Sequence, residues 1–465
     1  MHELKLPSGG SLIPPGAPEH EAEQVGFNLI VPAGRPAALV AAAGPDDVLE
    51  AVRHAADRGL PIGVQATGHG VALPFDGAVL ISTRAMDQVR IDPVARTAVV
   101  RAGARWGEVV RRASEFGLAP LNGASPSVGV VSYLLGGGLG HLGRSYGYGA
   151  DRVRSLEVVT PKGEALHVSP RHHPDLFWGL RGGKGNFGVV TSVQIELVVV
   201  PRLYGGALLL PGEAAGDVLR TWRDWTRGMP DRMQSGLAFM RFPDDPGLPE
   251  PMRGRFLAHL RLAFNGPAEE GERLVRPLRE IRPPVLDLVR DMSYARVAEI
   301  NMDPTRPGVY FERSARLRAL DDAALDTLLG FVEEMADGVR PGIELRHLGG
   351  ALGRHPEHPN ALPFREAEYT LFTGMPVGPG EADEVHGHQQ RLVDAMLPWR
   401  IGGPFLSFIS ARENTPEAMR SAYDHQTYQG LVRLKDAHDP ENLLRLNHNI
   451  PPTGWTGGGS GEHRA

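Results

Sequence analysis

The chain has 465 residues, among them 58 glycines, 40 prolines and no cysteine, and its formal net charge is −6. This length exceeds that of one typical domain, and the composition is that of a globular protein with many turns. The absence of cysteine excludes disulfides, thiolate metal sites and a cysteine nucleophile, and the slightly negative charge without a long basic run argues against nucleic acid as a partner.

The first residues lack the pattern of a secretion signal. MHELKLPSGGSLIPPGAP contains no basic stretch followed by an apolar one, and no window of the chain approaches the roughly 20 apolar residues of a membrane helix. We therefore expect a cytoplasmic protein with no membrane partner, in which residues 1–35 precede the first domain.

Residues 38–66 have the pattern of a strand, a helix and a second strand. ALVAAA is apolar, Pro45 opens a helical segment that Gly59 closes, and PIGVQA follows. The turn at 67–70, with the sequence TGHG, comes directly after the second strand, where α/β sheets place ligand-binding loops. We expect this turn to contribute to a binding site.

Several strand-like runs and one helical segment occupy residues 79–200. VLIST, TAVVRAG and RSLEVVT are short and apolar, and the helical segment covers 106–116. Over 189–199 apolar side chains alternate with polar ones, which predicts one half-buried strand. Pro201 then marks a domain boundary.

Residues 202–412 show a different pattern. Strand-like runs such as GRFLAHLRLAF and GIELRHLGGA alternate with amphipathic helical segments such as DDAALDTLLGFVEEMADG, which predicts an antiparallel sheet covered by helices. Over 413–452 the chain is helical again, and the glycine-rich end at 453–465 is expected to form a flexible tail.

A glycine motif of the G-x-G-x-x-G type lies at 138–143. A dinucleotide fingerprint must open a helix, but the glycines at 143, 147 and 149 would weaken a helix there by up to about 1 kcal/mol each, which argues against NAD. The bare backbone at 136–140 instead allows a diphosphate or a flat ring to approach. A tight turn between buried strands is the alternative that a glycine cluster alone favours.

Four motifs occur together in a fixed order. They are GHG at 68–70, SPSVGVVSYLLGGGLGHLGRSYGYGADRV at 125–153, PDLFWGLRGGKGNFGVVT at 174–191 and KDAHDPENLLRLNHNI at 435–450. They resemble the motifs of FAD-linked oxidases of the vanillyl-alcohol oxidase and p-cresol methylhydroxylase (PCMH) superfamily. The resemblance is strongest to the berberine bridge enzyme-like (BBE-like) branch, which includes 6-hydroxynicotine oxidase.

This resemblance implies an α+β fold with two domains. A PCMH-type FAD-binding domain would cover 36–201, and a substrate-binding domain of antiparallel sheet and helices, at 202–412, would be inserted into it. The segment 413–452 would return to the FAD domain, so that the flavin lies where the two domains meet.

The resemblance also assigns cofactor contacts. In such enzymes the histidine of the G-H turn bonds to the 8α-methyl carbon of the isoalloxazine ring, and His69 occupies this position; a neutral imidazole, with a reference pKa of about 6.5, is a suitable nucleophile. Many relatives have a second link through a cysteine where this chain has Ser125, so FAD is expected to have a single attachment. The other expected cofactor-binding residues are Ala66, Thr67, Gly68, Gly70, Pro126, Val128, Gly129, Ser132, Leu135, Gly136, Gly137, Gly138, Gly140, Tyr146, Asp151, Gly188, Val189, Val190, Asn447 and Asn449.

The chain departs from the family's pattern at three places. Gln65 replaces an arginine four residues before the histidine, and Lys184 interrupts the glycine run RGGKGNFG. Where relatives have a Y-x-N strand near the flavin, residues 405–407 read Phe-Leu-Ser, which removes a phenol and an amide.

Flavin oxidation needs a base that takes a proton from the substrate. In the predicted strand GIELRHLGGA, Glu344 and Arg346 share one face and His347 lies on the other, so either Glu344, with its charge set by Arg346, or His347 could act as this base. The alternatives are a surface ion pair and a buried structural histidine. Further candidates for the pocket are Tyr133, His141, Tyr310 and Tyr369, and Tyr369 is also a candidate catalytic residue.

These features predict an FAD-dependent oxidoreductase, in the first place an oxidase. It would remove a hydride from a small alcohol, amine or ring carbon of a specialised (secondary) metabolite and pass the electrons to O₂. The alternatives are a flavin dehydrogenase with another acceptor and a non-redox cyclase or binding protein that retains FAD. The histidines of HPEHP and HGH lack the spacing of a metal site, so no metal is expected, and the chain is expected to be a monomer or homodimer.

Overall fold

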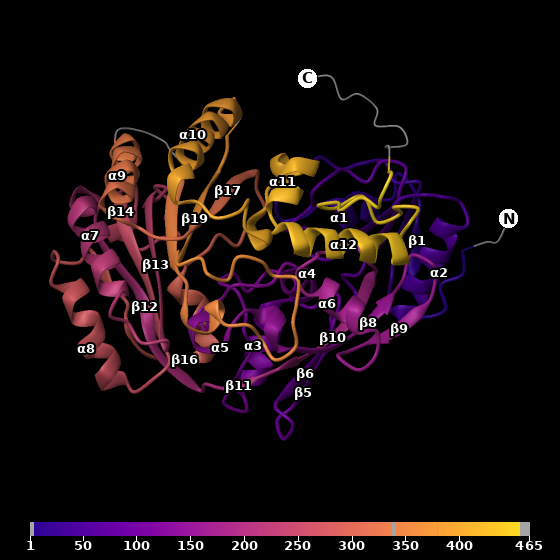
Figure 1. The fold of residues 1–465 in the computed structure, drawn as a ribbon, viewed down its shortest axis with the longest axis horizontal. Helices are drawn as coiled ribbons and strands as arrows, with labels where there is room; N and C mark the ends of the chain where they lie inside the picture. Colours follow the sequence, from indigo (N-terminus) through magenta and orange to yellow (C-terminus); the bar gives the residue numbers. More distant parts are fainter. Residues whose placement is uncertain (1–3, 337–340, 379, 456–465) are drawn as a thin grey trace.

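The N-terminal part of the chain forms a small mixed sheet, on the right in Figure 1. This computed structural model describes residues 4–336, 341–378 and 380–455. The strand order is β1–β2–β4–β3, in which β4 pairs in parallel with both β2 and β3. The strands are β1 (Ser11–Ile13), β2 (Ala38–Ala41), β3 (Ile62–Gln65) and β4 (Val79–Ser82).

Two helices accompany this sheet, α1 (Pro18–Gln24) and α2 (Pro45–Ala56). Pro45 is the first residue of α2, where a missing N–H costs nothing, and the helix packs its apolar face on β2 and β4 through Val48 and Val52. The predicted strand, helix and second strand are therefore present, with β4 inserted between the two strands. The segment before residue 36 contributes β1 to this sheet, because β1 pairs with β2.

A second, five-stranded antiparallel sheet has the order β5–β6–β10–β8–β9. Its strands are β5 (Val89–Asp92), β6 (Thr97–Arg101), β8 (Val153–Val159), β9 (Ala165–Val168) and β10 (Val189–Glu196). Helices α3 (Trp106–Ser114), α4 (Val130–Leu135) and α6 (Pro174–Leu180) share its apolar core. One prediction was wrong here: the strand expected over 189–199 ends at Glu196, and Val199, expected to be buried, is 55% exposed. The strand ends before Leu197 because the following residues form β11 (Val198–Val199), which pairs with β7 (Leu118–Ala119) and not with this sheet.

The glycine cluster follows a helix. The apolar run before it forms α4, and Gly137 and Gly138 then adopt positive φ angles of 101° and 75°. The alternative of a turn between buried strands is therefore wrong, because the cluster terminates a helix, where residues with positive φ favour glycine. The short helix that follows, α5 (Gly143–Tyr146), has only four residues, so the motif does not open a long helix as a dinucleotide fingerprint would.

An eight-stranded antiparallel sheet forms the left half of Figure 1. Its main order is β15–β12–β14–β13–β18–β19–β17, and β16 also pairs with β12. The strands are β12 (Arg202–Pro211), β13 (Met233–Arg241), β14 (Phe256–Phe264), β15 (Leu286–Asp287), β16 (Arg290–Ser293), β17 (Tyr310–Leu317), β18 (Gly342–His347) and β19 (Tyr369–Pro376). The helices that cover one face are α7 (Ala215–Thr226), α8 (Ala268–Arg279), α9 (Asp322–Ala336) and α10 (Ala382–Ala395). The prediction of an antiparallel sheet covered by helices is confirmed.

The two faces of this sheet differ in chemistry. On β14, Leu260 and Leu262 point into the apolar core under the helices, whereas the intervening Arg261 points to the opposite face. The same alternation holds on β18, where Leu345 faces the helices and Glu344 and Arg346 face away from them. The face turned toward the N-terminal sheets is therefore polar although it is buried.

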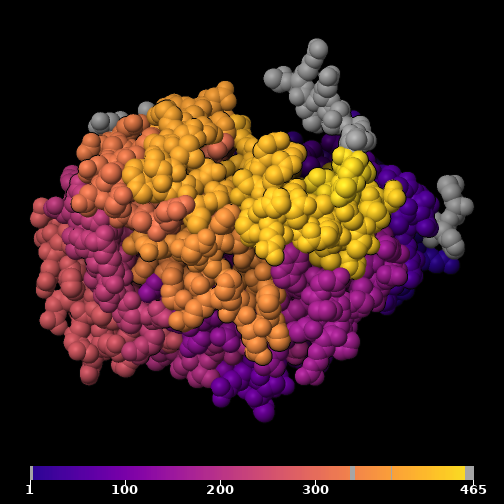
Figure 2. Space-filling model, viewed as in Figure 1, coloured from indigo at the N-terminus to yellow at the C-terminus, as the bar shows by residue number. Residues whose placement is uncertain are grey.

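The C-terminal segment crosses back to the N-terminal sheets. Helix α12 (His425–His438) packs on α6, and α11 (Pro416–Ser421) adds Met419 to the same apolar core. Figure 2 shows this yellow segment against the magenta surface of the N-terminal half. The ammonium group of Lys435, fully buried, is paired with Asp439 at 2.7 Å and donates to the carbonyl of Asn186 at 3.1 Å. Of the expected tail, Thr453 donates to Asp436, whereas residues 456–465 lie outside the described part of the chain.

Short 3₁₀ helices complete the described elements, at Gly149–Arg152, Gly212–Ala214, Glu250–Met252, Tyr294–Ile300, Gly350–Gly353, Leu397–Trp399, Leu406–Phe408 and Ala411–Glu413. Among the described residues, no helix combines the length and the hydropathy needed to cross a bilayer.

Candidate active site

A cavity of about 1030 Å³ lies between the two N-terminal sheets and the C-terminal segment. Most of its wall comes from four separate stretches, at 62–72, 131–135, 184–190 and 444–448, and Phe75, Thr83 and Ala102 complete it. We call it the cofactor cavity, since many of the residues expected to bind FAD line it. The expected cofactor-binding residues that line it are Ala66, Thr67, Gly68, His69, Gly70, Ser132, Leu135, Gly188, Val189, Val190 and Asn447.

His69 stands in the wall of this cavity with both ring nitrogens engaged. Its Nδ1 lies 2.9 Å from Thr67 Oγ1 and its Nε2 lies 3.2 Å from Ser127 Oγ. Phe27 stacks on the imidazole with ring centroids 4.2 Å apart. Burial, and to a lesser extent the charge of Arg105, lowers the pKa of His69 to about 4. The imidazole is therefore neutral at physiological pH and retains a nucleophilic nitrogen.

The turn that carries His69 is tightly packed on one side and open on the other. A side chain at Gly68, whose φ is +66°, would approach Gly26 Cα to 2.2 Å, whereas Gly70 faces open space. Among the described residues, the backbone N–H groups of Gly68, His69 and Gly70 find no acceptor. Successive free N–H groups form an anion-binding concavity, as a diphosphate requires.

Asparagine oxygens at the C-terminal end add to this arrangement. Asn447 Oδ1 and Asn449 Oδ1 are buried and find no hydrogen-bond partner within the described ranges, and Asn447 lines the cavity. Buried polar atoms normally have a partner, so these oxygens are suited to donors of a ligand. The residues present thus fit FAD, with free N–H groups for its diphosphate and His69 for its dimethyl edge.

Other expected contacts lie behind the cavity wall. The N–H of Gly129 donates to Thr67 Oγ1 at 3.3 Å, so the segment that contains Pro126, Val128 and Gly129 braces the histidine turn from outside. Gly138 donates to Ser407 Oγ, which in turn donates to the carbonyl of Gly136. The glycine cluster is therefore tied to the segment at 405–408, and none of Gly136, Gly137 and Gly138 lines the cofactor cavity.

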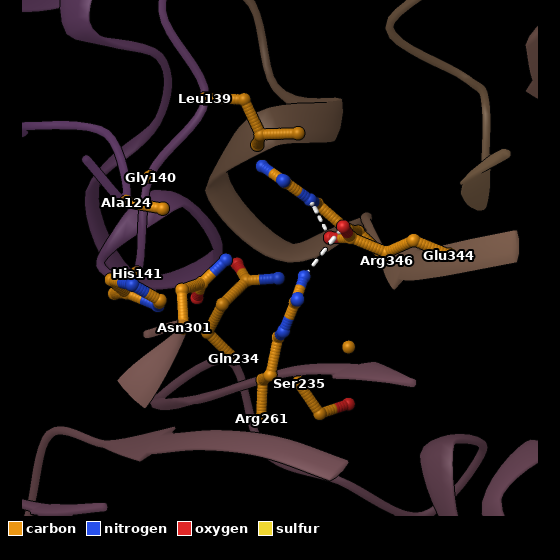
Figure 3. Close-up of a pocket in the computed structure, with 11 residues that line it drawn as sticks. Ala124, Leu139, Gly140, His141, Gln234, Ser235, Arg261, Asn301, Glu344 and Arg346 are labelled. Atoms are coloured by element: carbon orange, nitrogen blue, oxygen red, sulfur yellow. Dashed lines mark hydrogen bonds and ion pairs between the residues drawn. The ribbon is translucent and has the colours of Figure 1, made fainter. Parts of the chain in front are cut away.

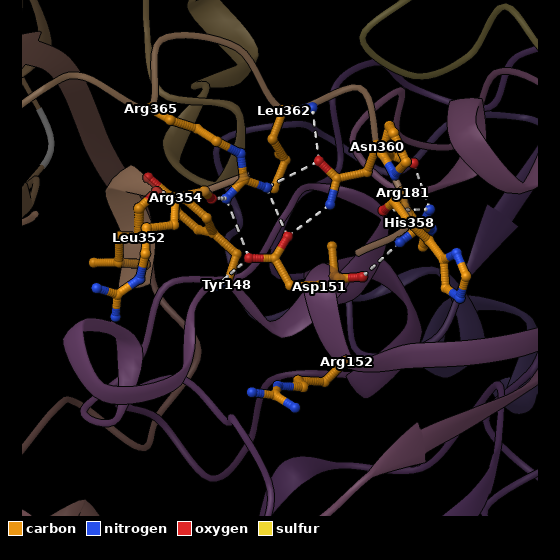
Figure 4. A network of polar contacts seen from close by, with 12 residues as sticks. Tyr148, Asp151, Arg152, Arg181, Leu352, Arg354, His358, Asn360, Leu362 and Arg365 are labelled. Atoms are coloured by element: carbon orange, nitrogen blue, oxygen red, sulfur yellow. Dashed lines mark hydrogen bonds and ion pairs between the residues drawn. The ribbon is translucent and has the colours of Figure 1, made fainter. Parts of the chain in front are cut away.

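Two residues that were expected to bind the cofactor, Tyr146 and Asp151, bind other side chains of the protein instead. The hydroxyl of Tyr146 accepts from Asn265 at 3.0 Å. The carboxylate of Asp151 pairs with Arg365 at 2.6 Å and accepts from Asn360 at 2.7 Å, and the side chains of Arg365 and Asp151 are only 5% and 7% exposed. Figure 4 shows this network, which connects the segment at 352–365 to the first half of the chain.

A second pocket, of about 360 Å³, lies on the polar face of the eight-stranded sheet. We call it the sheet-face pocket; Ala124, Leu139, Gly140, His141, Gln234, Ser235, Gly236, Arg261, Asn301, Glu344 and Arg346 line it. Gly140, expected to contact the cofactor, thus lies here, in the stretch that follows the glycine cluster. Figure 3 shows Arg261 and Arg346 approaching Glu344 from two sides, with His141 and Asn301 across the space.

The environment of Glu344 disfavours its expected role as a base. Arg261 Nη1 lies 2.5 Å from its Oε2 and Arg346 Nε contacts its Oε1. Although burial opposes ionisation, the two guanidinium groups hold the pKa of Glu344 at about 2, so the carboxylate is a weak proton acceptor. The alternative of a surface ion pair is also wrong, because Glu344 is only 7% exposed.

The other two expected catalytic residues lie on the helix-covered face of the sheet. His347 and Tyr369 stack with ring centroids 5.5 Å apart; Arg144 donates to His347, and the Tyr369 hydroxyl bonds to Thr226 at 2.8 Å. Neither residue lines the cofactor cavity or the sheet-face pocket. The structure thus separates His347 from Glu344, as the strand alternation predicts.

Sequence reasoning missed a carboxyl group on β17. Glu312 lies on the same face of this strand as Tyr310, whose ring stacks on Phe27 at 5.4 Å and so connects β17 to His69. Burial raises the pKa of Glu312 to about 7, and the neighbouring carboxyl groups of Asp303 and Glu413 contribute. The sequence shows an acidic residue on the inward face of the strand YFERSARL. The groups that raise its pKa come from distant segments, so the sequence could not predict this shift.

The departures from the family's pattern have local partners. The side-chain amide of Gln65 donates to the carbonyls of Glu23 and Gln24, at 2.8 and 3.0 Å. Lys184 lines the cofactor cavity and donates to the carbonyl of Leu406 at 2.8 Å, and burial lowers its pKa to about 8. Residues 405–407, expected as a strand, begin a 3₁₀ helix over Leu406–Phe408, because Ser407 turns back to the glycine cluster.

The fold and the cavity define a flavoprotein oxidoreductase of PCMH type. An FAD binding domain family matches residues 36–169. The chain is 30% identical to (R)-6-hydroxynicotine oxidase of Paenarthrobacter nicotinovorans over 437 residues, which cover 90% of this chain and 92% of that protein. Xylooligosaccharide oxidase of Thermothelomyces thermophilus is 28% identical over 456 residues, or 90% and 87% of the two chains.

Solved structures show the same fold. The crystal structure of 6-hydroxy-D-nicotine oxidase from Arthrobacter nicotinovorans superposes with a TM-score of 0.82 at 25% identity and covers 96% of this chain and 98% of that one. BBE-like 1 of Physcomitrella patens gives a TM-score of 0.82 at 19% identity over 96% and 97% of the chains. The chain belongs to the BBE-like branch of the PCMH superfamily of FAD-linked oxidoreductases, and it is an FAD-dependent enzyme.

Proposed function

We propose that the protein is an oxidase that holds FAD by a single covalent bond through His69 and oxidises a small alcohol, amine or ring carbon of a specialised metabolite, with O₂ as acceptor. In this proposal residues 36–201 and 413–452 bind the cofactor, and residues 202–412 bind the substrate. The oxidase names of relatives that match over nine tenths of the chain support the reaction class.

The observation that carries the proposal is the position and protonation of His69. A neutral imidazole, oriented by Thr67 and Ser127 and stacked on Phe27, stands in a cavity wall. The backbone N–H groups next to it have no acceptor among the described residues. A second link is excluded on chemical grounds, because position 125 carries a hydroxyl that bonds to Ser127 Oγ at 2.8 Å. When bound, FAD supplies the hydride acceptor.

We infer that Glu312 is the base, because it shares a face of β17 with Tyr310, and Tyr310 stacks on Phe27, which in turn stacks on His69. A carboxyl group with a pKa of about 7 is close to the ideal for proton transfer at neutral pH, because both the deprotonated fraction and the basicity are then substantial. Among the described residues, Glu312 makes no ion pair or hydrogen bond that would hold its charge. Glu344, in contrast, is occupied by two guanidinium groups.

The covalent bond is tested by acid precipitation of the purified protein. We expect a yellow pellet and an intact mass about 0.8 kDa above that of the bare chain, from the mass of the cofactor. The matched variant His69→Ala should give a colourless pellet and release its flavin into the supernatant. Release of the flavin from an active wild-type protein would contradict the covalent bond.

The acceptor is tested by reducing the holoenzyme with a substrate under anaerobic conditions and then admitting air. Rapid return of the oxidised spectrum with stoichiometric peroxide is the expected result. A flavin that stays reduced in air but is reoxidised by an artificial dye would indicate a dehydrogenase instead.

A further inference from the structure

The sheet-face pocket has an unusual surplus of donors. Its carboxylate, Glu344, uses one oxygen for Arg261 and the other for Arg346. Each guanidinium group carries five N–H donors, so one carboxylate cannot satisfy both. Arg261 is buried and the side chain of Arg346 is 18% exposed, and both line the pocket. A buried donor that is left unpaired is costly, which applies to Arg261 above all.

The remaining donors can be located. Arg261 Nε is buried and has no hydrogen-bond partner in the described part of the chain. Arg346 contacts Glu344 through Nε, and its two Nη groups have no hydrogen-bond acceptor among the described residues; Figure 3 shows this end of the side chain pointing away from Glu344, toward Leu139. The two Nη groups form a planar edge of the kind that binds a carboxylate with two parallel hydrogen bonds.

The other titratable groups around the pocket do not supply the missing negative charge. Burial lowers the pKa values of His141 and His259 to about 3, so both imidazoles are neutral. Asp303 interacts with Arg261, Arg346 and Glu344, and burial raises its pKa, so this carboxyl group holds its charge less firmly than Glu344 does. Two guanidinium groups thus share one firmly ionised partner.

We propose that the sheet-face pocket binds the carboxylate group of an acidic substrate, held by the Nη edge of Arg346 and supported by Arg261. Across the space, Asn301 Oδ1 is a buried acceptor that has no donor among the residues the structure describes, and it can bind a hydroxyl or amino group of the same molecule. This inference rests on the proposed function, since it names the substrate class of that enzyme as a small organic acid.

The test uses benzoate as the probe, with benzamide as its neutral isostere and benzylamine as its cationic one. Each is titrated into the yellow holoenzyme, and binding is followed by the change in the flavin spectrum and by the shift in melting temperature. We expect benzoate to bind about tenfold more tightly than benzamide, as for a hydrogen bond to a charged group, and benzylamine to bind more weakly than either.

Two variants should shift the benzoate affinity in opposite directions. Arg346→Lys keeps the charge but loses the planar edge, so the Kd for benzoate should rise about tenfold. Glu344→Gln removes the competing carboxylate and should lower that Kd. If the ion pair were purely structural, the two variants would not change the Kd for benzoate in opposite directions. The control variant is Arg420→Lys, on the exposed surface of α11, and it should leave that Kd unchanged.

Two results would overturn the inference while leaving the proposed function intact. One is a flavin-loaded enzyme that shows no preference for benzoate over benzamide, and the other is equal benzoate affinity in the wild type and Arg346→Lys. A protein that cannot take up flavin at all would instead contradict the proposed function.

Discussion

The cofactor cavity and the sheet-face pocket are built in different ways. The cofactor cavity uses backbone N–H groups, glycines and two histidines, His69 and His448, most of them in short contiguous motifs. The sheet-face pocket uses charged side chains from β14 and β18 together with Gly140 and His141 from the first half of the chain. A site made of local backbone geometry can be recognised from sequence, whereas a site made of side chains from separate strands depends on strand register.

The prediction with the largest expected effect concerns Glu312, whose place near the site follows only from the strand register of the sheet. Glu312→Gln should lower kcat/KM by about 100-fold to 10,000-fold, the range for loss of a general base. Because the carboxylate form is the active one and its pKa is about 7, wild-type activity should rise with pH through about 7, and the variant should lose this limb. A pH profile of kcat/KM measures both effects.

The matched control is Glu333→Gln, which changes an exposed carboxylate on α9. It should leave both the rate and the pH profile unchanged. An unaltered profile in Glu312→Gln would assign the proton transfer to another group.

The second prediction concerns the network that joins the two halves. Asp151→Ala leaves the guanidinium of Arg365, 5% exposed, without its partner and should lower the free energy of unfolding by about 3–5 kcal/mol. Denaturant titration of the holoenzyme measures this loss. Asp291→Ala, which breaks an exposed ion pair with Arg202, is the control and should shift the midpoint little. Equal losses in the two variants would show that burial of the network is unimportant.

The third prediction uses the buried histidines. The pKa values of His141, His259 and His347 are lowered to about 3, so in the folded protein these imidazoles stay neutral while those of the unfolded chain become protonated below about 6.5. Stability should therefore fall as the pH falls from about 6.5, by up to about 1.4 kcal/mol per pH unit for each imidazole. His259→Gln should make the slope of unfolding free energy against pH shallower, whereas a slope unchanged by this variant would argue against the assignment.

The smallest expected effect concerns the orientation of His69. Thr67→Val removes the hydroxyl that lies 2.9 Å from Nδ1 and should slow covalent flavin attachment several-fold, by about 1 kcal/mol, as for loss of one hydrogen bond. The time course of acid-stable yellow colour in apoprotein mixed with FAD measures the rate. Ser127→Ala removes the partner of Nε2 instead. If Thr67 orients the ring and Nε2 forms the bond to the flavin, only Thr67→Val should be slow. If only Ser127→Ala is slow, Nδ1 forms the bond instead.

Much of the fold was predictable because it rests on local patterns. Pro45 and Gly59 delimit α2, and strand alternation places Glu344 and His347 on opposite faces of β18. Predictions were less reliable where a segment interacts with a distant one. The strand expected over 189–199 broke because β11 pairs with β7, and Phe405-Leu406-Ser407 curls into a 3₁₀ helix because Ser407 binds Gly136 and Gly138.

The sequence by itself determined the class of protein and the position of its expected flavin anchor, because a histidine in a glycine turn with its companion motifs is a local signature. Only the tertiary structure decided the chemistry of the opposite wall. There, the charge state of Glu344 depends on Arg261, 83 positions away along the chain, and that of Glu312 depends on Asp303 and Glu413. Burial and Coulomb interactions act through space, so a protonation state is determined only after folding brings these groups together.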